Sequence, residues 1–337
     1  MKQRITIVDV ARQAGVSIAT VSAALNNRSG VAEPTRQRIV TVAERLGWSP
    51  SLRGRSLSQE RAFTVGLVLQ RESSVIASDP FFASFISGIE SVLEHRGYAL
   101  VLQVAPTRTR AFERYRRLAA DHRIDGVFLT DVSVPDPRFE LVQDLGMPAV
   151  AINVDPREGI STVRQDHERG IAALLEHLVD LGHRRIAHVS GPKDYIHTRQ
   201  RENAWRGVLA AAGLRASTPV QEDFSLAGGS RAAATLLARR SRPTAVFCSN
   251  DLMAIGFIAK AAEMGMSVPG DVSVAGYDGI DFGAYVRPSL TTVTTAPHAL
   301  GELAAKALLG MIEGQTASHV DTEPATLVVR DSTGPAS

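Results

Sequence analysis

Two short helices joined by a glycine turn are predicted by the stretch Ile5-Thr6-Ile7-Val8-Asp9-Val10-Ala11-Arg12-Gln13-Ala14-Gly15-Val16-Ser17. Thr6, followed by Asp9 three residues later, is typical of a capping box at a helix start. Apolar side chains then recur on one helical face until Gly15 ends the helix. Ser17 is a favoured N-cap residue, so a second helix is expected directly after the turn.

The pattern continues outward into a second and a third helix. Pro34 falls in the first turn of the third helix, where its missing N–H does no harm. Gly47 and Pro50 end that helix. Three short helices with a tight turn between the first two are typical of a helix-turn-helix, whose second helix can enter the major groove of DNA. Many small helical domains share this pattern, so a purely structural helical domain remains the alternative at this point. The inward faces are Val21, Ala24 and Leu25 in the second helix and Ile39, Val42, Ala43 and Leu46 in the third.

The positive charge of the chain is concentrated in this first part. Residues 1–60 carry nine Lys or Arg and four Asp or Glu, a net charge of +5, whereas the whole chain carries +2. The remaining residues therefore carry −3. A basic head on a mildly acidic body favours contact with a polyanion such as DNA. Charge alone leaves a solvated basic surface as the other interpretation.

Residues 51–61 are small, polar and basic, which predicts a linker or a marginal helix. Gly54 lies in the middle and disfavours a helix by about 1 kcal/mol relative to Ala. We therefore expect three parts: a helix-turn-helix head of residues 1–50, a linker of residues 51–61 and a core of residues 62–337.

The core alternates short apolar runs with amphipathic helices, which predicts parallel sheets wound by right-handed crossovers. About nine strands in one stretch indicate two sheets side by side, with a ligand between them at the carboxyl ends of the strands. The strand-like runs are Val65–Leu69, Ala99–Val104, Gly126–Leu129, Ala149–Val154, Arg185–Val189, Ala245–Cys248 and Val272–Ala275. The helical patterns include Phe82–Arg96, Gly170–Leu181, Ala204–Ala212, Ser230–Arg240 and Leu252–Met264.

Several classes of protein are disfavoured by what the sequence lacks. No apolar run is long enough to span a bilayer and no secretion signal precedes the head, so a cytoplasmic protein is expected. Cys248 is the only cysteine, which fits a reducing compartment. His177, His183 and His188 lack metal-ligand spacing, and neither a Ser–His–Asp set nor a phosphate-binding glycine loop stands out. We therefore expect no metal, no cofactor and no enzymatic activity.

The residues of the head are more specific than its pattern. The opening stretch, Thr20-Val21-Ser22, Leu25-Asn26, Thr35-Arg36, Gly47-Trp48-Ser49-Pro50 and Arg55-Ser56-Leu57 resemble the headpiece of the lactose-repressor (LacI/GalR) family. The resemblance extends over nearly the whole chain. It includes Asp79-Pro80-Phe81-Phe82, Ile124-Asp125-Gly126, Leu181-Gly182-His183-Arg184-Arg185-Ile186-Ala187, Ser249-Asn250-Asp251, Gly276-Tyr277-Asp278 and Leu290-Thr291-Thr292-Val293.

The resemblance implies an all-α helix-turn-helix headpiece followed by an α/β core like that of periplasmic binding proteins, with two doubly wound parallel-sheet lobes. It also implies a recognition helix and a hinge helix over residues 51–58, with Leu57 wedged into the minor groove. Ile18, Ala19 and Ala23 are apolar where many relatives are polar, so they would read thymine methyls and shape, unless they belong to the core of the head. Gly54 stands where relatives have Ala, and Ala32 where they often have a capping Ser. The DNA-binding residues that the resemblance implies are Thr6, Ser17, Ile18, Ala19, Thr20, Ser22, Ala23, Asn26, Arg53, Arg55 and Leu57.

The resemblance also implies a ligand cleft in the core. Carboxylate, amide and guanidinium groups suit the hydroxyls of a sugar, and phenyl rings suit its apolar face. Asn153 stands where some relatives have Asp, and Gly279 replaces the second Asp of a pair common in the family. Phe81 and Phe82 alternatively belong to the core at a helix start, and Asp278 is alternatively a cap. The implied cleft residues are Phe81, Phe82, Asn153, Arg199, Phe224, Asn250 and Asp278.

Together these features predict a transcriptional repressor whose affinity for a palindromic operator is switched by a small effector, most simply a sugar. A palindrome needs two heads, so a homodimer is expected. A sugar-binding receptor without DNA function is the main alternative, and a doubly wound enzyme is a weaker third. Deleting residues 1–60 distinguishes the first two, because only a repressor loses DNA affinity. The sequence leaves open which ligand binds, which operator is read, and whether the ligand weakens or strengthens DNA binding.

Overall fold

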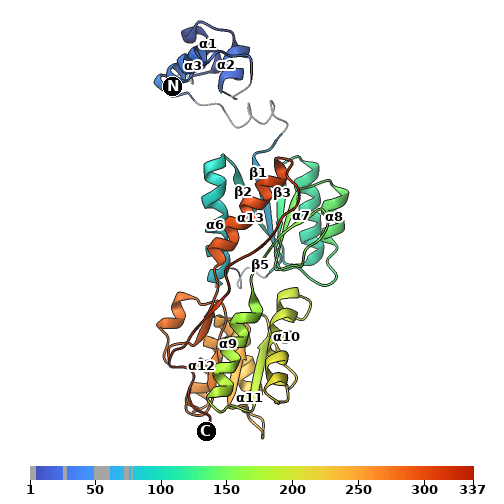
Figure 1. Ribbon diagram of the computed structural model, residues 1–337, viewed down its shortest axis with the longest axis vertical. Coiled ribbons are helices and arrows are strands. Elements are labelled where there is room, and N and C mark those ends of the chain that lie inside the picture. Colours follow the sequence, from blue (N-terminus) through green and yellow to red (C-terminus); the bar gives the residue numbers. More distant parts are fainter. Residues whose placement is uncertain (1–4, 26–28, 49–60, 72–75, 77–78) are drawn as a thin grey trace. The chain divides into compact units, whose positions relative to one another are not determined.

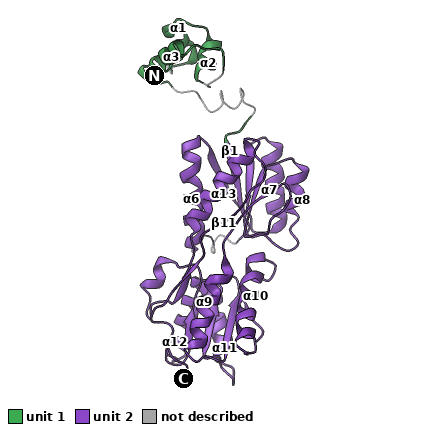
Figure 2. Ribbon diagram, viewed as in Figure 1, with its two compact units in different colours: residues 1–63 green, residues 64–337 purple. Residues whose placement is uncertain are grey.

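The computed structural model describes residues 5–25, 29–48, 61–71, 76 and 79–337. The chain divides into two compact units, residues 1–63 and residues 64–337 (Figure 2). This division falls within two residues of the expected start of the core at residue 62. Expectations for residues 51–60, the hinge helix included, lie outside the described residues.

The first unit is a three-helix domain built as its sequence pattern predicts. Its helices are α1 (Ile7–Ala14), α2 (Ile18–Leu25) and α3 (Glu33–Arg45). Gly15 adopts a left-handed φ of 66° and ends α1, a conformation that suits glycine because it has no Cβ. The predicted inward faces of the three helices pack into one small apolar core, joined at its edge by Val16 and Trp48. The third helix begins after Ala32 without a side-chain cap, as the missing serine implies.

The second unit contains two lobes, and the first is built on a six-stranded parallel sheet in the order β11-β5-β4-β3-β1-β2. Its strands are β1 (Thr64–Leu69), β2 (Ala99–Val104), β3 (Gly126–Leu129), β4 (Ala149–Ile152), β5 (Ser161–Arg164) and β11 (His319–Asp321). Helices α6 (Pro80–Arg96) and α13 (Pro297–Ile312) cover one face, and α7 (Arg108–Ala120) and α8 (Arg138–Asp144) cover the other (Figure 1). Each face therefore has its own apolar core, as a parallel sheet requires.

The second lobe repeats this design on a four-stranded parallel sheet in the order β7-β6-β8-β9. The strands are β6 (Ile186–Ser190), β7 (Val220–Gln221), β8 (Ala245–Cys248) and β9 (Ser273–Ala275). Helices α9 (His167–Asp180) and α10 (Ile196–Ala211) cover one face, and α11 (Leu226–Leu237) and α12 (Asp251–Glu263) cover the other. A short helical turn, η1 (Asp281–Ala284), and an antiparallel pair, β10 (Thr292–Thr294) with β12 (Thr326–Val328), complete the lobe.

Three segments of chain cross between the lobes, at residues 164–167, 294–297 and 321–326. The first lobe is therefore completed by α13 and β11, which come from the C-terminal part of the sequence. All seven predicted strands are present, with ends that shift by at most two residues. The strands not predicted, β5, β7, β10, β11 and β12, have two to four residues, too few for a clear apolar pattern. Among the described residues, no helix has both the length and the apolar character needed to cross a membrane.

Candidate DNA-binding surface and ligand pocket

The outward side of α2 presents small and apolar groups. Ile18 is 48% exposed and Ala19 is also exposed, whereas Ser22 and Ala23 are half-buried. The core positions of the helix are Val21 and Ala24 instead. The side chains of Ile18 and Ala19 are therefore available to contact DNA and are not part of the core of the head.

The start of α2 is fixed by local hydrogen bonds. The Ser17 hydroxyl accepts from the Thr20 backbone N–H at 3.1 Å and lies 2.8 Å from the Thr20 hydroxyl. At the start of α1 the direction is reversed, because the Thr6 N–H and hydroxyl both donate to the Asp9 carboxylate. These side chains hold two exposed helix N-termini, where backbone N–H groups suit phosphate oxygens. The remaining predicted DNA contacts lie outside the described residues: Asn26, Arg53, Arg55 and Leu57.

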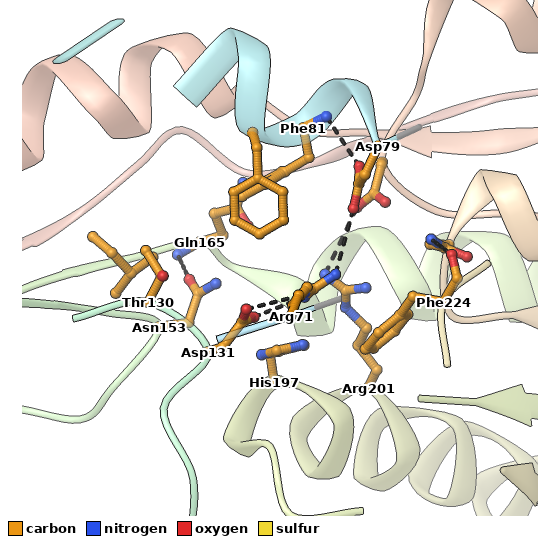
Figure 3. Close-up of a pocket in the computed structure, with 14 residues that line it drawn as sticks. Arg71, Asp79, Phe81, Thr130, Asp131, Asn153, Gln165, His197, Arg201 and Phe224 are labelled. Atoms are coloured by element: carbon orange, nitrogen blue, oxygen red, sulfur yellow. Dashed lines mark hydrogen bonds and ion pairs between the residues drawn. The ribbon is translucent and has the colours of Figure 1, made fainter. Parts of the chain in front are cut away.

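A pocket lies between the two lobes of the core, where the parallel strands of both sheets end (Figure 3). It contains six of the seven residues expected at a ligand cleft, and most of the other lining residues also follow a strand or lie at the start of a helix. This is the location that parallel sheets favour for ligands. The lining residues are Arg71, Asp79, Phe81, Phe82, Thr130, Asp131, Ile152, Asn153, Gln165, His197, Arg201, Phe224, Asn250 and Asp278.

The seventh expected residue, Arg199, does not line this pocket. Arg199 is exposed and donates to the Lys193 carbonyl at 3.0 Å, away from the pocket. Two residues in an α-helix are separated by about 200°, so Arg199 and Arg201 point to opposite sides of α10. Arg201, together with His197 one turn earlier, faces the pocket.

Arg71 is the centre of the first lobe's side of the pocket. Its guanidinium donates to both carboxylate oxygens of Asp131, at 2.8 and 2.7 Å, and lies 3.5 Å from Asp79. Burial alone would raise the pKa of Asp131, but the charge and hydrogen bonds of Arg71 outweigh burial and lower it. Burial raises the pKa of Asp79, whose contact with Arg71 is longer. This wall is therefore a closed set of paired charges.

Arg71 also contacts the second lobe through aromatic rings. Its guanidinium carbon lies 5.1 Å from the ring centre of Phe224 and 5.9 Å from that of Tyr195. Both rings come from the second lobe, whereas Phe82, at 5.0 Å, comes from the first. A buried cation over aromatic faces is stabilised by the ring quadrupoles. Arg71 therefore bridges the lobes within the pocket.

The second lobe holds Phe224 by close packing. A Cβ on Gly191 would lie 1.9 Å from the ring, so only glycine permits this approach. The Asn250 amide donates to the Phe224 carbonyl at 2.9 Å and accepts from the Met253 N–H. Asn250 lines the pocket as expected, but both ends of its amide are used to position Phe224 and to cap α12.

The charges of the second lobe are less completely paired. Arg201 lies 3.7 Å from the Asp278 carboxylate, and its Nε atom has no hydrogen-bond partner among the described residues. Burial raises the pKa of Asp278 well above its usual range, and Arg201 offsets this only in part. Burial, with Arg201 nearby, lowers the pKa of His197 to about 3, so this ring is neutral. This wall retains hydrogen-bonding capacity for a ligand.

Four pocket residues other than glycine adopt positive φ angles. Asp131 has 47°, Asn153 60°, Phe224 67° and Asp278 111°. Each follows a strand, and such backbone costs about 1–3 kcal/mol per residue unless the surroundings hold it. Strain of this kind clusters at functional sites. Four such residues in one pocket therefore support a functional role for it.

The pocket offers polar groups in little free space. The Thr130 hydroxyl and both ends of the Gln165 amide are buried without partners among the described residues, like the Nε atom of Arg201. The free volume is about 50 Å³, room for a few water molecules. Unpaired neutral donors and acceptors beside phenyl rings suit a neutral, hydroxylated ligand. A ligand larger than this volume requires a shift of Arg71 or of the lobes.

Sequence reasoning missed eight of the fourteen residues that line the pocket. Arg71 and Asp131 each come two residues after a predicted strand, so their position near a strand end was a usable signal. Gln165 follows β5, which the sequence did not predict. The mutual proximity of these residues had no such signal, because it depends on how distant strands are ordered. In addition, the described residues contain no group of three His, Cys, Asp or Glu side chains placed to hold a metal ion.

A helix-turn-helix head and a two-lobed α/β core with a pocket between its lobes define a ligand-responsive DNA-binding protein. Comparison with known proteins agrees. Residues 6–51 match the family described as bacterial regulatory proteins, lacI family, and residues 175–333 match the periplasmic binding protein-like domain.

Similar proteins align with almost the whole chain. The HTH-type transcriptional repressor PurR of Erwinia tasmaniensis is 34% identical over 334 residues, 97% of this chain and 96% of its own. The ribose operon repressor of Escherichia coli K12 is 33% identical over 315 residues, 92% of this chain and 94% of its own. The crystal structure of the lac repressor dimer bound to operator and the anti-inducer ONPF is similar, with a TM-score of 0.82 at 26% identity, and the match covers 98% of this chain and 100% of that one. The chain belongs to the lacI family of bacterial regulatory proteins, and it is a DNA-binding transcriptional repressor.

Proposed function

We propose that this repressor acts as a homodimer on a palindromic operator, with one head on each half-site. The side chains offered to base edges are Ile18 and Ala19, with Ser22 and Ala23 beside them, while the starts of α1 and α2 contact phosphates. Aliphatic side chains contact thymine methyls, so the half-site contains thymine at the positions facing α2. The similar lac repressor structure is a dimer on operator DNA, which supports this assembly. We assign no catalytic activity to the chain, because its relatives are repressors.

The effector that the pocket fits best is a small neutral sugar. The observation that carries this proposal is the set of unpaired, buried, neutral polar groups next to Phe81, Phe82 and Phe224. A sugar can place its hydroxyls against these polar groups and its C–H face against the phenyl rings. The relative named ribose operon repressor supports a sugar of pentose size.

Switching follows from linkage between the pocket and the lobes. Arg71 belongs to the first lobe but lies over Tyr195 and Phe224 of the second, in the space that the ligand needs. A ligand that displaces this guanidinium changes which lobe orientation is favoured. The difference in ligand affinity between the two orientations is the free energy available to change DNA binding.

Selection of duplexes from a random palindromic library, with and without a panel of neutral sugars, tests the proposal. We expect one enriched palindrome whose affinity for the full-length chain changes with one sugar. Enrichment that no neutral sugar affects, together with a response to a charged compound, would overturn the effector assignment. Enrichment of asymmetric sites alone would overturn the dimer.

A further inference from the structure

The outer helix α7 carries an unusual density of arginine. Arg108, Arg110, Arg116 and Arg117 are exposed on it, and Arg123 is exposed three residues beyond its end. None of these five forms an ion pair with a carboxylate of the described residues. The guanidinium of Arg116 instead lies 5.3 Å from the Phe112 ring centre. The two carboxylates of this segment, Glu113 and Asp121, leave most of the positive charge uncompensated.

This segment contrasts with the rest of the core. Residues 108–123 contain six Arg, two acidic residues and no Lys, a net charge of +4. The whole of residues 61–337 carries −3, so the core without this segment carries −7. The positive potential of this patch is therefore local, because the rest of the core is acidic. Arg makes up 33 of the 37 basic residues of the whole chain, so the segment is distinguished by its density of charge and not by its lack of Lys. The planar fork of each Arg can donate two hydrogen bonds to one phosphate.

The topology places one end of this patch where the DNA-binding head is attached. The chain passes from β2 through α7 to β3, and these strands are parallel, so α7 runs back toward the strand starts. The Asp125 N–H, just after the patch, donates to the Thr64 carbonyl at 2.7 Å. Thr64 begins β1, directly after the segment that links the core to the head. Arg117 and Arg123 therefore lie toward the end of the lobe at which the head is tethered.

We propose that Arg117 and Arg123 form a second, sequence-independent DNA contact of this repressor, made to the phosphate backbone next to the half-site that the head reads. The tether keeps bound DNA at a high effective concentration near this end of the lobe, so weak phosphate contacts add to operator affinity. They carry no base specificity, because phosphates are the same at every sequence. They set the salt dependence of binding instead.

The test is the salt dependence of operator binding by the full-length chain carrying Arg117→Gln and Arg123→Gln. Each lost phosphate contact lowers the slope of log affinity against log salt by about 0.9. We expect the magnitude of the slope to fall by about 1.8 for each chain, or about 3.6 for the dimer, so that a fourfold rise in salt reduces wild-type dimer affinity about 150-fold more than variant affinity. The probe is a long duplex with the selected operator at its centre, followed by fluorescence anisotropy.

The matched control removes the same charge from the other lobe, with Arg239→Gln and Arg240→Gln, both exposed at the end of α11. The wild-type slope in this control, with the reduced slope in the α7 variant, supports the proposal. Equal reductions in both variants would overturn it, because net charge alone would then explain them. An unchanged slope in the α7 variant would also overturn it and would favour an acidic protein as the partner of α7. Operator binding by the head persists in every variant, so neither failure is a failure of the repressor function.

Discussion

The two walls of the pocket solve the burial of charge in opposite ways. On the first lobe, Arg71 forms two short hydrogen bonds to Asp131 and a longer contact to Asp79, so its charge is balanced. On the second lobe, Arg201 lies 3.7 Å from Asp278 and keeps an unpartnered donor. A closed ion pair holds structure, whereas an incomplete one has capacity left for a ligand. We therefore assign the paired charges of the first wall to the stability of the core and the incompletely paired charges of the second wall to ligand affinity.

The largest effect is expected from breaking the closed wall. Asp131→Asn keeps a residue that tolerates the left-handed backbone but leaves Arg71 without its main partner. Removal of one member of a buried pair costs about 3–5 kcal/mol. We expect urea unfolding to report a loss of about 3 kcal/mol, because Asp79 still offsets part of the charge. Arg71→Met combined with Asp131→Asn should recover part of it. A loss below about 1 kcal/mol in the single variant would contradict the assignment of this wall to stability.

Substitution of Arg201 on the second wall, where charges are incompletely paired, should affect ligand affinity instead. Arg201→Met removes donors to the ligand, and a hydrogen bond from a charged group contributes about 1.5–3 kcal/mol, or roughly 10- to 100-fold in affinity. Calorimetry with the sugar selected from the panel measures this loss. Arg199→Met is the matched control, because Arg199 lies on the opposite side of the same helix and should change affinity less than twofold. Equal losses in the two variants would refute the assignment of Arg201.

The pH dependence of stability tests the burial of His197 on the second wall. His197 has a folded pKa of about 3, whereas an unfolded histidine titrates near 6.5. The unfolded state therefore binds more protons than the folded state below pH 6.5. As the pH is lowered from 6.5 toward 3, this group reduces the free energy of unfolding by about 1.4 kcal/mol per pH unit. His197→Gln should remove that slope in urea unfolding between pH 6.5 and 5. The exposed His122, changed to Asn, is the control; a slope that changes in the control and not in His197→Gln would contradict the prediction.

The smallest effect is expected at Thr130, the one unpaired hydroxyl on the closed wall. Its Oγ1 atom is buried without a partner among the described residues. Thr130→Val keeps the shape and removes a desolvated polar atom, so the free energy of unfolding should stay within about 0.5 kcal/mol. Sugar affinity should fall by about 1 kcal/mol, roughly fivefold, if the hydroxyl contacts the ligand. Unchanged affinity would mean that the Thr130 hydroxyl does not contact the ligand.

The head was predictable from the sequence because its determinants are local. Thr6 and Asp9, three residues apart, hold the start of the first helix, Gly15 supplies a left-handed turn, and Ser17 caps the next helix. Each of these interactions joins residues within one turn, so spacing along the chain reveals it. The exposure of Ile18 and Ala19 follows from the same periodicity, once Val21 and Ala24 occupy the core side.

The helix-turn-helix head and the alternation of strands and helices could be predicted from the sequence, and six of the pocket residues could be predicted through the family resemblance. Two further features required the folded chain: Arg71 pairs with Asp131, 60 residues away, and Arg201 rather than Arg199 faces the pocket. The reason is the separation along the chain of the residues that interact. Caps, turns and apolar periodicity act between neighbours in the chain, whereas the pairing of buried charges depends on the order of strands in a sheet and on the rotation of a helix against it.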